Sequence, residues 1–316
     1  MNPTRVHSAE PKLEKVGDTR PVEVSQVCKS FSNTRVVDEV SFSICAGEIF
    51  GMVGPNGAGK TTTIRMLMDI VKPDSGNIRL FGAPLQEDTK NRIGYLPEER
   101  GLYKKLTVSE SLAYLAELKG IDRKLARERA GELLKQVDMY IHKDKKVQEL
   151  SRGMGQIIQV LSTILHEPEL VILDEPFSGL DPVNINLLKQ IISKLKNQGR
   201  SIIMSSHQMN EVEMLCDRVL MINKGQVALY GNLMEIKSQY RNNSIFVQCN
   251  HLPDDLPGVI GKTNHGTYDE LFIDGEISPQ EILGALVTRD ITVNRFEVST
   301  PSLNEIFLRI AKKESS

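Results

Sequence analysis

The residues GPNGAGKTT, from Gly54 to Thr62, follow the short apolar segment EIFGMV and precede the helix-like segment TTTIRMLMDIV. Their spacing matches the phosphate-loop pattern GxxxxGK[ST], in the strand, loop and helix context that the pattern requires. Glycines at these positions allow consecutive backbone N–H groups to turn inward around phosphate oxygens. The stretch therefore predicts an α/β fold with a nucleotide phosphate site.

Each residue type in the stretch has a physical task. We expect Lys60 to pair with the β- and γ-phosphates and Thr61 to hold Mg²⁺. A glycine-rich turn with an exposed lysine is the structural alternative, and the flanking strand and helix argue against it. The residues expected to contact the phosphates are Gly54, Pro55, Asn56, Gly57, Ala58, Gly59, Lys60, Thr61 and Thr62.

An acidic pair supplies the second half of the predicted site. The segment LVILDE places Asp174 at the end of an apolar strand, where a carboxylate can reach Mg²⁺ through water. Glu175 is the next residue, points differently, and is expected to accept a proton from the attacking water. Taken alone, the pair could be an ordinary acidic strand end, but beside Lys60 it predicts nucleotide hydrolysis.

The rest of the chain predicts two domains. Residues 1–20 are polar and are expected to form a loose tail. The first domain, 21–240, begins with strand-like alternation, and residues 107 to 140 have a helical pattern. From 168 onward short strands alternate with helix candidates, as in a parallel sheet covered on both faces. Turn formers near 241 then suggest a boundary, and 241–316 read as a small α+β domain.

Composition limits the function classes. The chain has 316 residues, with 39 Lys and Arg against 41 Asp and Glu. This balance produces no strong positive field, which argues against nucleic-acid binding. No apolar run approaches the roughly 18 to 20 residues that span a bilayer, and no signal peptide is evident. The four cysteines lack ligand-like spacing. We therefore expect a cytosolic protein with reduced thiols.

Five segments occur together in a diagnostic order: GPNGAGKTT, LSRGMGQ, LVILDE, SGLD and SSH. In order and approximate spacing they closely resemble the ATP-binding subunits of ABC transporters, from about residue 22 to 240. The resemblance implies a P-loop NTPase fold of ABC type, with a helical subdomain at about 98–165, and ATP and Mg²⁺ as cofactors. Its C-terminal part resembles that of the ATPase subunits of drug and sodium exporters, where the added domain is expected to regulate or to help dimerisation.

The family's site residues carry over individually. Phe31 matches the residue that stacks on adenine, and His207 matches the histidine that contacts the γ-phosphate and steadies the water. Ser151 and Gly153, in LSRGM, match the signature that closes over ATP bound to a second subunit. Asp181 matches the residue that contacts the opposite subunit's site. The resemblance thus implies two ATP molecules held between two identical copies in a two-fold pair.

Two positions depart from the family pattern. Glu98, in YLPEERGLY, stands where the family usually has a glutamine that contacts Mg²⁺ and the lytic water. A carboxylate supplies an oxygen but adds charge and cannot donate a hydrogen bond. In the signature, usually LSGGQ, Arg152 replaces a glycine and Met154 replaces the glutamine. The phosphate-facing Ser151 and Gly153 remain, so we expect activity to survive.

The resemblance implies a partner as well. An ATPase of this family powers transport through a separate transmembrane permease, which would place this chain at the cytoplasmic face of the cell membrane. The alternatives are a soluble mechanical ATPase acting on ribosomes or DNA, and a degenerate cassette without activity. Mechanical ATPases of this fold usually have two cassettes or a long coiled-coil insertion, whereas here only a helical subdomain separates Lys60 from Ser151. The catalytic positions are intact, which argues against a degenerate cassette.

Overall fold

The computed structural model describes residues 20–99, 101–240 and 243–313, without the side chains of the last three. The predicted tail, 1–20, falls almost entirely outside the described residues. Contacts divide the chain into two compact units, Met1–Gly231 and Asn232–Ser316. No helix in the described part has the length and apolar character needed to cross a bilayer.

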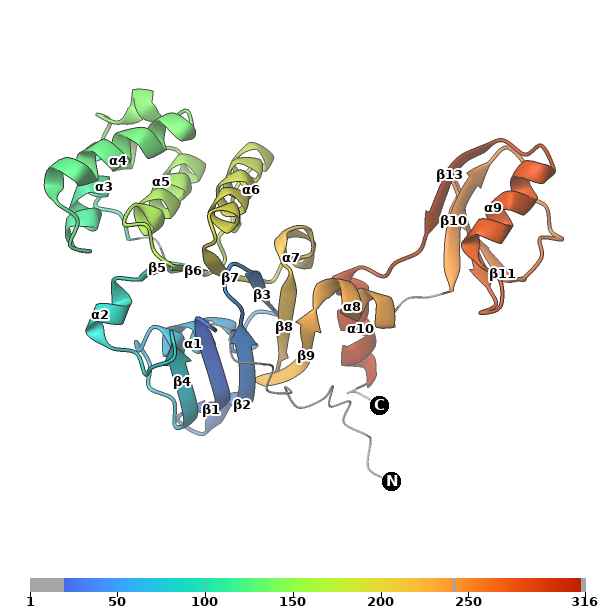
Figure 1. Ribbon diagram of the computed structural model, residues 1–316, viewed down its shortest axis with the longest axis horizontal. Helices are drawn as coiled ribbons and strands as arrows, with labels where there is room; N and C mark the ends of the chain where they lie inside the picture. The colour runs from blue at the N-terminus through green and yellow to red at the C-terminus, as the bar shows by residue number, and fades with distance from the viewer. Residues whose placement is uncertain (1–19, 100, 241–242, 314–316) are drawn as a thin grey trace. The chain divides into compact units, whose positions relative to one another are not determined.

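The first unit contains two sheets and a set of helices (Figure 1). A three-stranded antiparallel sheet has the order β2-β1-β4, and a six-stranded sheet has the order β5-β6-β7-β3-β8-β9. The strands are β1 Val22–Phe31, β2 Thr34–Ile44, β3 Ile49–Val53, β4 Ser75–Leu80, β5 Ile93–Leu96, β6 Leu170–Leu173, β7 Ser201–Ser206, β8 Arg218–Asn223 and β9 Gln226–Asn232. The helices are α1 Lys60–Leu67, α2 Glu87–Lys90, α3 Val108–Glu117, α4 Arg123–Gln136, α5 Arg152–Ile164, α6 Pro182–Asn197 and α7 Met209–Leu215, with 3₁₀ turns at Tyr140–His142 and Val147–Glu149.

Parallel pairing places the site-forming strand ends together. β5, β6, β7, β3 and β8 pair in parallel, so their carboxyl ends lie along one edge of the sheet. Every residue of β3 and β6 is buried, as the apolar runs predict for strands covered on both faces. The core between the sheets and α1 includes Phe42 and Phe50, whose rings stack at 5.4 Å.

The helix after the phosphate loop is shorter than the sequence predicts. Its apolar pattern continues to Val71, but α1 ends at Leu67. Asp69 adopts a left-handed φ of 59°, and the N–H groups of Asp69 and Ile70 donate back to the carbonyls of Met66 and Arg65. This pair of bonds is the Schellman arrangement, which satisfies the last carbonyls of the helix and stops it.

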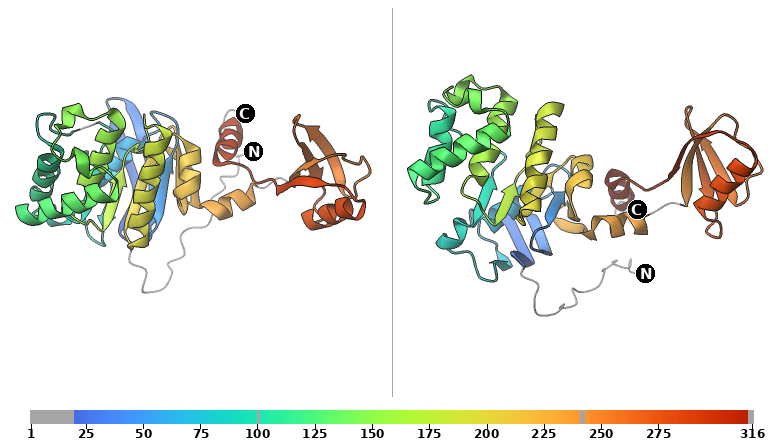
Figure 2. Two further views of the ribbon diagram at one scale, coloured as in Figure 1. Left: turned by 90° about the horizontal axis from the view of Figure 1, so that it is seen from above. Right: turned by 45° about the horizontal axis from the view of Figure 1, so that its top comes forward.

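The helical region predicted at about 98–165 contains α3, α4 and α5. Thr107 begins α3 with a capping box, since its hydroxyl accepts from the Glu110 N–H while the Glu110 carboxylate accepts from the Thr107 N–H. α3 packs against α4 and α5, and α5 packs against α6, as two further views show (Figure 2). The signature helix α5 therefore contacts the large sheet directly at β5, and it also packs against α6, which contacts β7.

The second unit begins earlier than the sequence boundary near 240 suggested. It comprises helices α8 Leu233–Gln239, α9 Pro279–Thr288 and α10 Leu303–Lys313, and strands β10 Ser244–Cys249, β11 Val259–Asn264, β12 Asp269–Ile273 and β13 Val293–Val298. The strands form one sheet in the order β11-β12-β10-β13, with α9 packed on its apolar face. Arg309 of α10 donates to the Tyr240 carbonyl just after α8, which links these two parts of the unit.

A partly buried histidine joins α5 to the large sheet. Nε2 of His166 lies 3.2 Å from the Ile93 carbonyl oxygen, and the Lys119 ammonium lies 3.4 Å from the same oxygen. Burial, helped by the nearby Lys119 charge, lowers the pKa of His166 from its usual value near 6.5 to about 4. His166 is therefore neutral in the folded protein at pH 7.

Acid should destabilise the fold partly through this histidine. Between pH 6.5 and 4 His166 becomes protonated in the unfolded chain but not in the folded chain. The free energy of unfolding therefore decreases as the pH falls through this range. By pH 5 the wild type should lose about 1 to 2 kcal/mol more than a His166→Gln variant. Urea unfolding of the nucleotide-free proteins at pH 7.5 and 5 measures the difference. Equal losses in the two proteins would show that His166 is not the titrating group.

Candidate functional site

The phosphate loop occupies the turn between β3 and α1. Gly54 has φ 152°, and a Cβ there would lie 2.1 Å from the Ile222 carbonyl oxygen of β8. Gly59 has φ 109°, and its Cβ would lie 2.6 Å from the Val36 carbonyl oxygen. These two glycines are thus required by backbone contact. Gly59 also caps α1 without a side-chain hydrogen bond, which leaves the helix N–H groups available to an anion.

Lys60 is directed back over its own loop. Its side chain is only 5% exposed, and Nζ donates to the carbonyls of Gly54 at 2.8 Å and Pro55 at 3.2 Å. The same nitrogen lies 3.5 Å from Oε1 of Glu175. The structure thus brings the predicted phosphate-binding lysine and the predicted base together, although they are far apart in the sequence.

Asp174 lies beside the loop, at the end of β6. Its Oδ1 accepts from the Ser205 hydroxyl at 2.5 Å and from the Thr61 hydroxyl at 3.3 Å. Its Oδ2 is buried without a hydrogen-bond partner among the described residues. Burial raises the pKa of Asp174, against the effect of the two hydroxyl donors. A buried carboxylate oxygen without a partner, next to a threonine hydroxyl, suits a hard divalent cation.

Glu175 is held on both sides by basic side chains. Its Oε2 lies 2.8 Å from Nδ1 of His207, and its Oε1 faces Lys60. The backbone of Glu175 has φ 49°, in the left-handed region that is uncommon for a residue other than glycine. Its N–H donates to the Ser205 hydroxyl at 2.9 Å. The carboxylate is therefore fixed at the sheet edge, 8% exposed.

Two more predicted residues lie around this centre. Phe31 ends β1 with 48% of its surface exposed, and the Lys29 ammonium lies 5.7 Å from its ring centroid. An exposed ring of this kind can stack on a flat base. Glu98 is exposed just after β5, next to β6 in the sheet, and its negative charge adds to the raised pKa of Asp174.

The signature residues lie elsewhere in this chain. Ser151 is exposed and caps α5, accepting from the Met154 N–H at 3.2 Å. In the described part of the chain, no hydrogen bond or ion pair links Ser151 to the phosphate loop. A Cβ at Gly153 would lie 2.5 Å from Nδ2 of Asn184, whose amide donates to Asp181 at 2.6 Å. The signature turn therefore packs against the start of α6.

Asp181 and Arg152 make contacts within their own chain. Oδ1 of Asp181 accepts from the N–H groups of Val183 and Asn184 and so caps α6. Hydrogen bonds from the Asn184 backbone and side chain lower the pKa of Asp181. The Arg152 guanidinium packs on Gly179, since a Cβ at Gly179 would lie 2.5 Å from Nη2. The arginine that replaces a signature glycine thus covers the SGLD segment.

Ser205 and Gln156 belong to the site but were not predicted. Ser205 joins Asp174 to Glu175, and Gln156 of α5 donates to the Pro176 carbonyl at 3.2 Å. The only sequence signal for Ser205 is its place two residues before His207 in a strand. Gln156 ends the segment LSRGMGQ, but an inward-facing glutamine in an apolar helix is not distinctive by spacing.

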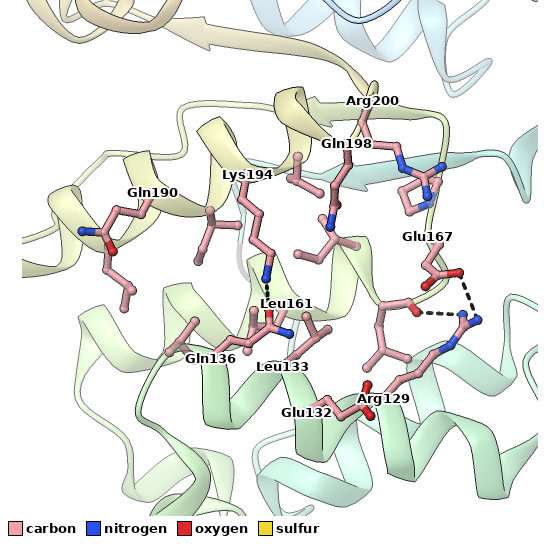
Figure 3. Close-up of a pocket in the computed structure, with 17 residues that line it drawn as sticks. Arg129, Glu132, Leu133, Gln136, Leu161, Glu167, Gln190, Lys194, Gln198 and Arg200 are labelled. Atoms are coloured by element: carbon pink, nitrogen blue, oxygen red, sulfur yellow. Dashed lines mark hydrogen bonds and ion pairs between the residues drawn. The ribbon is translucent and has the colours of Figure 1, made fainter.

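A separate cavity of about 480 Å³ lies between α4, α5 and α6 (Figure 3). Its lining includes Leu133, Leu161, Ile191 and Arg129, and Lys194 of α6 donates to Gln136 of α4 at 2.6 Å. Arg129 pairs with Glu167 at 3.0 Å. None of the predicted site residues lines this cavity, so it is distinct from the phosphate-loop site.

Comparisons with known proteins agree with the motifs. The ABC transporter family matches residues 37–178, and the C-terminal domain of DrrA1-3-like ATP-binding proteins matches residues 231–311. The chain is 41% identical over 291 residues to the ABC transporter ATP-binding protein YhaQ of Bacillus subtilis, covering 90% of this chain and 96% of that protein. It is 34% identical over 300 residues to the bacitracin transport ATP-binding protein BcrA of Enterococcus faecalis, covering 92% and 96%.

A solved structure shows the same architecture for the first unit. The structure of cbiO1 from Clostridium perfringens, described as part of the ABC transporter complex cbiONQ, has a TM-score of 0.64 at 25% identity, over 70% of this chain and 92% of that chain. The predicted fold class is thereby confirmed. With relatives this similar over nearly its whole length, the chain belongs to the ATP-binding subunits of ABC transporters and is an ATPase.

Proposed function

We propose that this ATPase powers a membrane exporter, through closure of two copies around two MgATP molecules. The observation that carries the hydrolytic part of the proposal is the position of Glu175, held between Lys60 and His207, next to Asp174, whose Oδ2 finds no hydrogen-bond partner among the described residues. A base, a phosphate-binding cation and a metal-binding carboxylate within one cluster support hydrolysis of a nucleoside triphosphate.

The chain's residues divide the chemistry among themselves. Glu175 accepts a proton from the attacking water, and His207 holds the Glu175 carboxylate in place. Lys60 and the N–H groups of the loop balance the charge of the phosphates. When bound, Mg²⁺ neutralises charge on the phosphate oxygens, and Thr61 and Asp174 are the residues that would hold it, with Glu98 nearby.

Pairing of two copies explains the exposed signature. Ser151 is exposed at the start of α5, and among the described residues no hydrogen bond or ion pair ties it to the phosphate loop of its own chain. A two-fold pair can bring this surface over the nucleotide of the other copy, and the same contact then occurs twice. We propose that this is a homodimer, with Asp181 near the shared boundary.

A transmembrane permease is the proposed partner, and the cytoplasmic face of the membrane is the proposed location. Support comes from cbiO1, which is part of a transporter complex, and from BcrA, a bacitracin transport protein. An exposed apolar patch at α3 offers a contact surface, with Tyr103, Tyr114 and Leu118 exposed by 48%, 40% and 63%. The two tyrosine rings meet edge to face at 5.2 Å.

Purification from membranes tests the proposed function. A tagged Glu175→Gln protein is isolated in mild detergent with MgATP, and the companion proteins are identified. We expect a polytopic permease to co-purify. Tyr114→Glu should reduce the amount of permease recovered. Ile70→Glu, a matched change at a residue that is 60% exposed and outside the patch, should leave that amount unchanged. Ribosomes or DNA in place of a permease would support the mechanical ATPase instead and contradict the transport proposal.

A further inference from the structure

The hydroxyl of Ser205 connects the two acidic residues of the site. Ser205 lies on β7 with 0% of its surface exposed. Its Oγ donates to Oδ1 of Asp174 at 2.5 Å and accepts from the Glu175 N–H at 2.9 Å. Its single proton is committed to Asp174, so the hydroxyl acts as a donor on one side and an acceptor on the other.

The first bond orients the Asp174 carboxylate. Because Ser205 and Thr61 both donate to Oδ1, the other oxygen, Oδ2, is left buried and without a partner among the described residues. A partner behind a metal-binding carboxylate fixes its orientation, and the loss of such a partner typically weakens metal affinity or activity about 10- to 100-fold.

The second bond holds the backbone of Glu175. This residue has φ 49°, a conformation that persists only where surrounding contacts fix it. The bond from its N–H to Ser205 is one such contact, and the bond of its carboxylate to His207 is another. Ser205 thus acts on the base through the main chain.

We propose that Ser205 is a positioning residue, which turns Oδ2 of Asp174 toward Mg²⁺ and fixes the backbone of Glu175. This inference rests on the proposed use of MgATP. Ser205 is fully buried and its hydroxyl is occupied by Asp174 and Glu175, so we assign it no direct contact with the water or the phosphates. Loss of the Ser205 hydroxyl is therefore expected to change the turnover rate and the Mg²⁺ dependence of nucleotide binding. Nucleotide binding without metal should not change.

The neighbouring serine provides a matched control. Ser206 is 2% exposed on the same strand, but its hydroxyl accepts from the Gln208 N–H at 2.9 Å and makes no bond to Asp174 or Glu175. Ser205→Ala and Ser206→Ala therefore each remove one buried hydroxyl, and only the first removes the link between the acidic residues.

Titration calorimetry with a non-hydrolysable ATP analogue tests the proposal, in EDTA and over a range of Mg²⁺ concentrations. We expect Ser205→Ala to bind the analogue normally in EDTA and to need about 10- to 100-fold more Mg²⁺ for half of the metal-dependent gain in affinity. Ser206→Ala should behave like the wild type. In parallel, the Mg²⁺ concentration for half-maximal hydrolysis should rise for Ser205→Ala alone.

Three outcomes would overturn the proposal. The first is an unchanged Mg²⁺ requirement in Ser205→Ala, and the second is an equal rise of the Mg²⁺ requirement in both variants. The third is failure of Ser205→Ala to bind the analogue in the presence of EDTA, which would indicate a general structural role. The wild type separates this inference from the proposed function: if its own binding does not depend on Mg²⁺, the MgATP proposal itself is wrong.

Discussion

Replacement of Glu175 by Gln should slow ATP hydrolysis about 100- to 10,000-fold and leave ATP binding intact, because a general base contributes about this much to the rate. Gln has nearly the same shape and can keep a hydrogen bond to His207, but its amide cannot accept the proton from water. The residues proposed to bind ATP, the phosphate loop and Phe31, keep their own side chains, and Lys60 loses only its charge pairing with Glu175. Steady-state phosphate release and equilibrium ATP binding measure the two effects separately.

An exposed glutamate serves as the control for this variant. Glu128 lies on α4, exposed and remote from the phosphate loop in the sequence, and Glu128→Gln removes the same charge. It should hydrolyse ATP at the wild-type rate. Unchanged turnover in Glu175→Gln would exclude Glu175 as the base, and lost ATP binding would show that its pairing with Lys60 is structural.

The parts of the site that depend on local chain geometry were predictable. The phosphate loop is a continuous segment, and its glycines are explained by positive φ values and close contacts at Gly54 and Gly59. Asp174 and Glu175 follow an apolar run of four residues, so their place at a strand end could be predicted from the run alone. In both cases a short continuous segment carries the pattern, although the contacts that require Gly54 and Gly59 come from Ile222 and Val36, which are distant in the sequence.

The meeting of Lys60, Glu175 and His207 is a property of the sheet. Their strands, β3, β6 and β7, are neighbours in the order β6-β7-β3, which differs from their order in the sequence. Family resemblance supplied this arrangement, whereas spacing alone could not. Ser205 was missed for the same reason, since its role depends on β6 lying beside β7.

The weakly patterned elements were also missed. β4 reads SGNIRL with only its last residue buried, and β11 reads VIGKTN without a buried residue, so neither shows the alternation of a half-buried strand. The boundary near 240 was inferred from turn formers. It separated α8 from the later residues, and the Arg309 bond to Tyr240 that joins them is a long-range contact.

Removal of the Ser151 hydroxyl should prevent ATP from pairing two copies. In the Glu175→Gln background bound ATP is not consumed, so closed pairs should accumulate. Each closed site would need the Ser151 hydroxyl from the opposite copy. Loss of this charge-assisted bond at both sites of a two-fold pair is expected to cost about 3 to 6 kcal/mol in association, at about 1.5 to 3 kcal/mol per bond.

The substitution also removes a helix cap, and its control must do the same. Ser151 caps α5 in the free chain, which is worth about 1 kcal/mol of stability. Thr107 caps α3 in the same way, so Thr107→Ala loses a comparable cap without changing the signature. If Ser151→Ala fails to form pairs and Thr107→Ala still forms them, the cause is loss of the Ser151 contact between the two copies and not loss of a helix cap.

Light scattering of the Glu175→Gln protein, with and without MgATP, tests most directly whether ATP is shared between two copies. With saturating MgATP the measured mass of the Glu175→Gln protein should rise from that of one chain to that of two. The Glu175→Gln, Ser151→Ala double variant should keep the mass of one chain. The Glu175→Gln, Thr107→Ala double variant should reach the mass of two chains, like its parent. A mass that does not respond to saturating ATP, or a Ser151→Ala variant that pairs as well as its parent, would contradict the shared site.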